Sequence, residues 1–291
     1  MYDTYDIERL RDYANLFSSQ TCERAIRYGD TYEIKKIYQK FDSDIQIHNK
    51  ISYWDYLDYV YKILCTFYRN EYVYKNEVIN KLLIKKYSLS KTVAINEFKV
   101  GKSIADLTMF NGSSKVFEIK SDLDSSRRLS SQISNYTRLF EKCFIVIPYD
   151  LIESYKSIVD DSIGIISLRR ARNGRLCLNE EREAISNYDI DVNILMSSVR
   201  ATEYKWMVQQ EYGALPNVND FEMFDACKDM LTRLSNIRLK ELFLEAVKKR
   251  STATRILKQI HPSSRQMCLS MSYNTKKIDK LISMYDSPIT L

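Results

Sequence analysis

The chain has 291 residues and a mass of 34.4 kDa, which is enough to bury a full core in one or two domains. Hydrophobic residues make up 45% and charged residues 28%, as in ordinary globular proteins. No run of about 18 apolar residues and no apolar signal segment occurs, so we expect a cytoplasmic protein without a membrane span. The net charge of +6 suits a polyanionic partner without requiring one.

The few metal-binding residue types restrict the possible chemistry. Six cysteines are scattered without a C-x-x-C pair, which argues against a zinc ribbon or an iron–sulfur cluster and for reduced thiols. The two histidines, His48 and His261, are far apart in sequence. Any bound metal would therefore be held by carboxylates.

The first part of the chain is expected to be helical. Residues 1–70 form a helical N-terminal region, in which Tyr53–Phe67 has an aromatic-rich helical period. A further helix is predicted over about residues 76–87, because Val78 and Leu82 repeat at helical spacing.

The pattern then changes to strands. Residues 92–98 and 104–110 are rich in β-forming residues, and residues 115–120 alternate in hydrophobicity. Asn111-Gly112 is a strong hairpin signal between the second and third of these strands.

A helix and another strand follow. Asp124 or Ser125 is expected to cap a helix that includes Ile133 and Tyr136, and the apolar run Cys143–Ile147 suits a buried strand. A strand entered through a helix usually lies parallel to a neighbour, so the sheet should be mixed. A second hairpin is predicted around Asn173-Gly174.

These elements define an α/β (α+β) fold with three parts. A mixed-sheet domain over residues 71–185, in the order αβββαβ, lies between the helical N-terminal region (1–70) and a helical C-terminal region (186–291). We expect the helical termini to offer a surface for a second copy of the chain or for a protein partner.

Two acidic residues and a lysine should meet at one edge of the sheet. Side chains alternate along a strand, so Glu118 and Lys120 share one face, and Asp106 on the preceding strand lies in the same neighbourhood. Asp106 and Glu118 could hold Mg²⁺ or Mn²⁺, which would polarise a phosphate and activate a bound water. Lys120 could stabilise charge on the phosphate. The alternative is an exposed ion pair on a solvated sheet face.

Further residues could complete such a site. Glu77 on the preceding helix could supply a third metal carboxylate, and Glu97 is a competing ligand at the end of the first strand. Gln132 and Tyr136 are four residues apart on the following helix and so share a face, where they could hydrogen-bond a phosphate or the nucleophilic water. For Tyr136, plain core packing is an equal alternative. Asp122 is better explained by a polar turn, although it could touch a second ion.

The run Ile104-Ala-Asp106 … Val116-Phe-Glu118-Ile-Lys120 resembles the signature of the PD-(D/E)XK nuclease superfamily, which has a restriction-endonuclease-like core. Gln132-x-x-x-Tyr136 is similar to the Q-x-x-x-Y element of some of its branches, and the stretch from Phe117 to Tyr136 resembles a poorly characterised bacterial branch.

The resemblance covers about residues 75–180. It implies Asp106 and Glu118 as metal ligands, Lys120 as the catalytic lysine and Glu77 as the helix-borne acid. Two departures stand out: Ala105 replaces the usual proline, and Ile104 falls where such proteins often carry a basic residue.

The expected function is hydrolysis of phosphodiester bonds by a Mg²⁺-dependent nuclease acting on DNA, in a defence, mobile-element or repair role. The catalytic residues would be Asp106, Glu118, Lys120, Gln132 and Tyr136. One alternative is a nuclease-like module that binds nucleic acid without cutting it. Another is a protein-interaction subunit in which the sheet is only a scaffold.

Overall fold

The fold is taken from a computed structural model that describes residues 5–45, 51–271 and 275–290. His48 lies outside these ranges. All six cysteines lie inside them and are free thiols, in agreement with the expectation from sequence. Among the described helices, none combines the length and the apolar character needed to cross a membrane.

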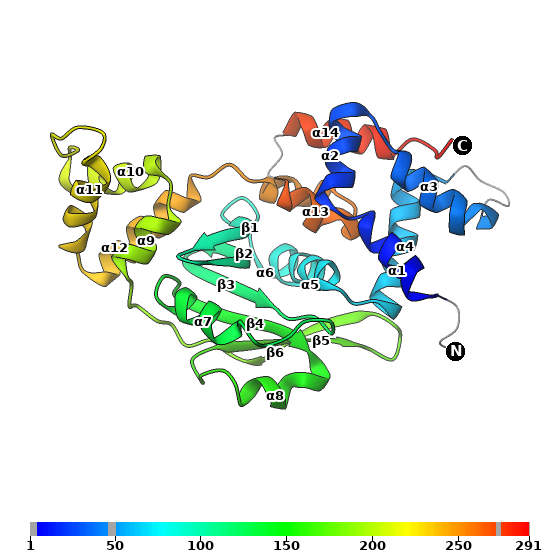
Figure 1. Cartoon of the computed structure of the whole chain (residues 1–291), viewed down its shortest axis with the longest axis horizontal. Coiled ribbons are helices and arrows are strands. Elements are labelled where there is room, and N and C mark those ends of the chain that lie inside the picture. The colour runs from blue at the N-terminus through cyan, green and yellow to red at the C-terminus, as the bar shows by residue number, and fades with distance from the viewer. Residues whose placement is uncertain (1–4, 46–50, 272–274, 291) are drawn as a thin grey trace.

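The centre of the molecule is a six-stranded sheet in the order β1-β2-β3-β4-β5-β6 (Figure 1). The β1–β2, β2–β3 and β5–β6 pairs are antiparallel, and the β3–β4 and β4–β5 pairs are parallel, so the predicted mixed sheet is confirmed. The strands are β1 Val93–Val100, β2 Ser103–Asn111, β3 Ser113–Ile119, β4 Lys142–Pro148, β5 Gly164–Arg170 and β6 Leu176–Arg182.

Both predicted hairpins are present, and a glycine makes each turn possible. Gly112 between β2 and β3 has φ 68°, and Gly174 between β5 and β6 has φ 79°. This left-handed backbone conformation carries a steric cost for residues with a Cβ, which explains the Asn-Gly signal at both turns.

Helices cover both faces of the sheet. The helices before it are α1 Ile7–Asn15, α2 Ser19–Tyr28, α3 Tyr32–Phe41, α4 Tyr53–Phe67, α5 Glu71–Val78 and α6 Ile84–Lys86. Those within or after it are α7 Leu129–Thr137, α8 Ile152–Lys156, α9 Val192–Ser198, α10 Ala201–Tyr212, α11 Met223–Thr232, α12 Asn236–Lys248, α13 Arg265–Ser270 and α14 Thr275–Tyr285. Short 3₁₀ turns, among them η4 Ala253–Gln259, join some of these.

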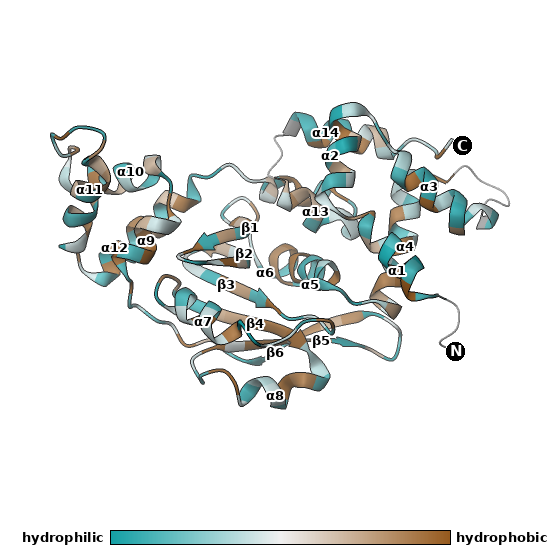
Figure 2. Cartoon of the chain, in the orientation of Figure 1, coloured by the Kyte–Doolittle hydropathy of each residue, from teal (hydrophilic) through white to brown (hydrophobic). Residues whose placement is uncertain are grey.

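The sheet separates two hydrophobic cores. On one face, Phe117 and Ile119 pack with α1–α5, α13 and α14. On the other face, Val116 and Ile145 pack with α7–α12. Figure 2 shows hydrophobic colouring along β4 and β5, which lie between these two layers. The C-terminal helices therefore divide between both cores, with α9–α12 at one end of the molecule and α13–α14 beside the N-terminal helices (Figure 1).

The helix before the sheet starts earlier than the pattern predicts. It begins at Glu71, because the side chain of Asn70 caps it by accepting a hydrogen bond from Val73 N. The helix continues through a π-helical stretch, Ile79–Leu83, into α6. The predicted start near residue 76 was wrong, because the buried Val73 and Tyr74 already belong to the helix.

One buried lysine joins α12 to the loop before β4 and to the segment after β6. The ammonium of Lys240 donates to the carbonyl oxygens of Phe140 at 3.0 Å and Asn187 at 2.7 Å. Desolvation by burial lowers the pKa of Lys240 to about 8, against a smaller raising effect of the nearby Cys143. A neutral amine still has two N–H donors for these two carbonyls, so deprotonation does not break the contacts.

Replacing Lys240 with methionine should lower the free energy of unfolding by about 1–3 kcal/mol, because two buried carbonyls lose their donor. Lys240 loses its proton near pH 8 in the folded protein but only at pH ~10.4 in the unfolded chain. Between these two values the unfolded state binds more protons, so the free energy of unfolding of the wild type rises with pH. The difference between wild type and variant should therefore grow by about 1–2 kcal/mol from pH 7.5 to 9.5 in urea unfolding. A difference that stays constant with pH would contradict this account.

Candidate active site

Strand β3 and helix α7 bring four of the predicted site residues into direct contact. Glu118 and Lys120 come from the end of β3, and Gln132 and Tyr136 come from α7, which packs over the same face of the sheet. Only 2% of Glu118 and 6% of Lys120 is exposed to solvent. The alternative of an exposed ion pair on a solvated sheet face is therefore wrong.

These four side chains form one hydrogen-bonded chain. The Lys120 ammonium lies 2.8 Å from Glu118 Oε1 and 3.1 Å from Gln132 Oε1. The Tyr136 hydroxyl lies 2.8 Å from Glu118 Oε2 and 2.9 Å from the carbonyl oxygen of Ile104. Burial, followed by the charge of Glu118, raises the pKa of Tyr136, so the phenol keeps its proton and donates. Tyr136 is thus both a core residue, 1% exposed, and a partner of the carboxylate.

Asp106 lies where strands β2 and β3 separate. The last paired residues of the two strands are Leu107 and Phe117. The next pair along the ladder would be Asp106 and Glu118, and these two residues are not paired. Instead, Asp106 Oδ2 accepts a hydrogen bond of 2.7 Å from Ile119 N. The carboxylate thereby occupies the gap between the strands beside the end of β3.

The two carboxylates interact electrostatically. Burial, and next the negative charge of Glu118, raise the pKa of Asp106 to about 6, while Lys75 and the N–H of Ile119 oppose the rise. Two neighbouring negative charges in a water-poor position repel each other, and a cation between them relieves that repulsion.

Helix α5 contributes two residues that sequence analysis missed. The Lys75 ammonium lies 3.2 Å from Asp106 Oδ1 and is also ion-paired with Glu71, one helical turn earlier. Glu71 is the acid of α5 on the Asp106 side, and its charge contributes to the raised pKa of Asp106. The Glu71/Lys75 spacing of four was the available signal, but it fell before the expected start of the helix.

Glu77 lies elsewhere. Its carboxylate accepts a hydrogen bond of 2.9 Å from the Tyr61 hydroxyl and pairs with Lys81 at 3.2 Å. At about 100° per residue, Glu77 is ~200° around the helix from Lys75, so the two point in nearly opposite directions. The structure thus does not bring Glu77 to Asp106 and Glu118.

Glu97 is not at the end of the first strand but in the middle of it, with an unusual backbone. Its φ of 56° is left-handed, and it is the β1 residue opposite Asp106, where the ladder lacks a pair. In a regular strand, Asn96 and Phe98 would point to the same face of the sheet. Here the Asn96 side chain hydrogen-bonds to Ser270 on α13, on one face, whereas Phe98 packs into the core on the other face, which α7 covers. Glu97 lines a hollow of about 320 Å³ together with Glu71 and Lys75.

The loop after β3 is a polar turn, as sequence analysis favoured. Asp122 pairs with Arg69 at 3.1 Å, and Asp124 accepts hydrogen bonds from the backbone N and hydroxyl of Ser121. Asp124 is therefore occupied in closing this turn. The expected cap by Asp124 or Ser125 was wrong: α7 begins at Leu129 without a side-chain cap.

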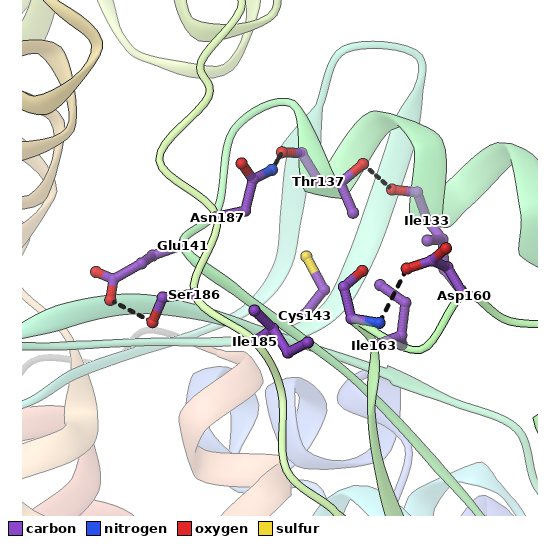
Figure 3. Close-up of a pocket in the computed structure, with 10 residues that line it drawn as sticks. Ile133, Thr137, Glu141, Cys143, Asp160, Ile163, Ile185, Ser186 and Asn187 are labelled. Atoms are coloured by element: carbon purple, nitrogen blue, oxygen red, sulfur yellow. Dashed lines mark hydrogen bonds between the residues drawn. The ribbon is translucent and has the colours of Figure 1, made fainter.

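A separate hollow of about 410 Å³ lies behind α7 (Figure 3). Its polar groups bond to one another, as Asn187 does with the Thr137 carbonyl and Ser186 with Glu141. Burial raises the pKa of Cys143 in its wall to about 12, so this thiol is protonated at neutral pH. None of the predicted site residues lines this hollow.

The donor atoms at Asp106 and Glu118 suit a hard divalent cation. Across residues 5–45, 51–271 and 275–290, no group of three or more His, Cys, Asp or Glu side chains is arranged to hold an ion. Mg²⁺, however, is commonly held by one or two carboxylates and completes its shell with water and substrate phosphate. Each carboxylate oxygen has two lone pairs, so the four oxygens retain acceptor capacity beyond their present hydrogen bonds.

The chain belongs to the family described as Bacteriophage P4 protein cII, whose model matches residues 66–276. It is similar to Protein cII of Enterobacteria phage P4, with 28% identity over 176 residues, which cover 59% of this chain and 64% of that protein. The match thus spans less than two thirds of that relative's length. A solved structure, the SPO1766 protein of unknown function from Silicibacter pomeroyi, aligns with a TM-score of 0.31 and 13% identity over 51% of this chain and 94% of that one.

Proposed function

We propose that this protein is a metal-dependent nuclease that hydrolyses phosphodiester bonds in DNA, with Asp106, Glu118 and Lys120 at its active site. The observation that carries the proposal is the burial of Glu118 and Lys120 in contact with each other beside Asp106. Burying charged groups is costly, and strongly perturbed charged clusters are typical of functional sites.

The order of elements around the site supports membership of the PD-(D/E)XK superfamily. A helix, α5, precedes an antiparallel β1–β2–β3 meander, and α7 leads to β4, which lies parallel to β3. The PD-(D/E)XK core has the same αβββαβ order. Asp106 lies on the second strand of this order and Glu118 on the third.

In this proposal Asp106 and Glu118 hold Mg²⁺ or Mn²⁺. When bound, the ion would supply Lewis-acid polarisation of the phosphate and a lowered pKa for a coordinated water. Lys120 donates to a phosphate oxygen or orients the attacking water. Gln132 fixes the Lys120 ammonium, and Tyr136 fixes the second oxygen of Glu118.

Cationic side chains near this end of the sheet support a nucleic-acid substrate. Because β3, β4 and β5 are parallel, their carboxyl ends lie at the same edge of the sheet. Beyond that edge the β5–β6 hairpin presents four exposed arginines, which suit contacts to a phosphate backbone. These are Arg169, Arg170, Arg172 and Arg175.

The direct test is incubation of the purified protein with supercoiled plasmid, single-stranded DNA and RNA in Mg²⁺, in Mn²⁺ or in EDTA. We expect nicking or degradation of DNA that requires the metal and stops on chelation. Comparison of the substrates defines which nucleic acid is cut. Absence of cleavage on all of them with either metal would reject the proposal.

A second candidate is a nuclease-like module that binds nucleic acid without cutting it. The ammonium of Lys75 on Asp106 and the lack of a three-residue ligand group among the described residues favour it. DNA binding that is identical in EDTA and Mg²⁺, with no cleavage, would select this candidate.

A further inference from the structure

A basic groove lies at the opposite end of the sheet from the candidate active site. It has a volume of about 740 Å³ and lies between the start of β1 and the segment that follows α12. Among the residues that the structure describes, five cationic side chains line it and no acidic one does: Lys91, Lys248, Lys249, Arg250 and Arg255.

Two of these cations are already engaged. Arg250 is nearly buried and forms two hydrogen bonds to Glu203, at 2.6 and 2.7 Å. Lys249 lies with its ammonium 3.7 Å from the centroid of the Trp206 ring. The Arg250–Glu203 pair ties the segment after α12 to α10 and so fixes one wall of the groove.

The other three cations are available for a ligand. Lys91, Lys248 and Arg255 are exposed, and within the part of the chain that the structure describes none of them pairs with a carboxylate. The opposite wall is rigid, because the Asn111 amide donates to the Thr92 hydroxyl, which donates to a backbone carbonyl. Exposed cations that have no ion-pair partner and lie along fixed walls create a positive potential that attracts an anion.

The lining favours a nucleic acid over a protein partner. Of the described residues that line the groove, Val93 is the only aliphatic one and none is aromatic, whereas protein interfaces normally have an apolar and aromatic centre. Lysine, arginine and hydroxyl groups are the usual donors to phosphate oxygens. We propose that this basic groove binds the phosphate backbone of a nucleic acid.

The groove and the candidate active site are separated along the sheet. Asn111 lies in the groove, and Asp106 is five residues earlier on β2, which corresponds to about 17 Å of strand. That distance is about five base pairs of duplex. The groove would therefore hold the part of the substrate that lies away from the cut. This extends the proposed function, but phosphate binding here needs no metal and can be measured without cleavage.

The experiment compares three proteins by fluorescence anisotropy with a labelled 20-base-pair duplex, in EDTA and from 50 to 200 mM KCl. These are wild type, the triple variant Lys91→Ala/Lys248→Ala/Arg255→Ala and a control, Arg11→Ala/Lys36→Ala/Lys62→Ala. The control removes the same charge from exposed positions on the N-terminal helices. Circular dichroism melting confirms that each variant folds.

We expect the triple variant to bind at least tenfold more weakly at 100 mM KCl, with the slope of log K against log[KCl] reduced by about 2–3, because three phosphate contacts are lost. The control should bind within about twofold of wild type. Equal weakening in triple variant and control, or none in either, would overturn the proposal.

Competition identifies the ligand. Tripolyphosphate or polyglutamate that displaces the duplex at micromolar concentration would assign the groove to a free polyphosphate or an acidic protein segment instead. The experiments distinguish failure of the proposal that the groove binds nucleic acid from failure of the proposal that the protein is a nuclease. Weakened binding by the triple variant without any wild-type cleavage keeps only the groove, whereas cleavage with unchanged binding keeps only the nuclease.

Discussion

Replacing Glu118 with glutamine should reduce metal-dependent DNA cleavage by at least about a hundredfold to a thousandfold, because the neutral amide cannot provide a charged metal ligand. The amide keeps the shape of the side chain: its oxygen can still accept from Lys120, and its NH2 group can donate to the Tyr136 hydroxyl, which keeps the Ile104 carbonyl as its own acceptor, so the fold should persist. The measurement is the initial rate of plasmid nicking in Mg²⁺ together with the melting temperature.

Glu77→Gln is the matched control for this variant. Glu77 is also a buried carboxylate held by a tyrosine and a lysine, but it lies on the side of α5 that faces away from Asp106. It should cut at nearly the wild-type rate. Loss of cleavage in Glu77→Gln with full activity in Glu118→Gln would contradict the assignment of Glu118 as a metal ligand. It would instead assign that role to Glu77, the helix-borne acid that the sequence resemblance implies.

Replacing Lys120 with alanine should reduce cleavage by about a hundredfold or more, because the proposed mechanism assigns to this ammonium a hydrogen bond to the phosphate or to the attacking water. Stability should also fall, by about 2–4 kcal/mol, since the buried carboxylate of Glu118 loses its cationic partner. Urea unfolding measures the second effect and a single-turnover cleavage assay the first.

The double variant Glu118→Gln/Lys120→Ala separates catalysis from folding. It should recover part of the stability that Lys120→Ala loses, because no unpaired charge remains, but it should recover no activity. Lys115→Ala, at the other end of β3, should cut normally. Cleavage by Lys120→Ala at the wild-type rate would show that the lysine has only a structural role.

Local rules were sufficient to predict much of the sheet. Alternating hydrophobicity and two Asn-Gly turns located the strands and hairpins, and the helical crossover predicted the parallel β3–β4 pair. The contact of Glu118 and Lys120 follows from strand periodicity, and that of Gln132 and Tyr136 with them follows from the four-residue spacing on a helix.

Long-range packing determined what the sequence did not indicate. Lys75 reaches Asp106 because α5 starts at Glu71 and packs close to the separating strands, a relation between elements about 30 residues apart. The left-handed backbone of Glu97 is also imposed by its surroundings, since glutamate has no preference for that conformation. The basic groove unites residues 91 and 255, which no local pattern connects.

The measurement closest to the central claim is a crystal structure of the protein grown or soaked with Mn²⁺, with diffraction data collected at the manganese absorption edge. The account predicts an anomalous peak between the carboxylates of Asp106 and Glu118, and its loss in Glu118→Gln. Ordered carboxylates with no peak, or a peak held by other residues, would contradict it.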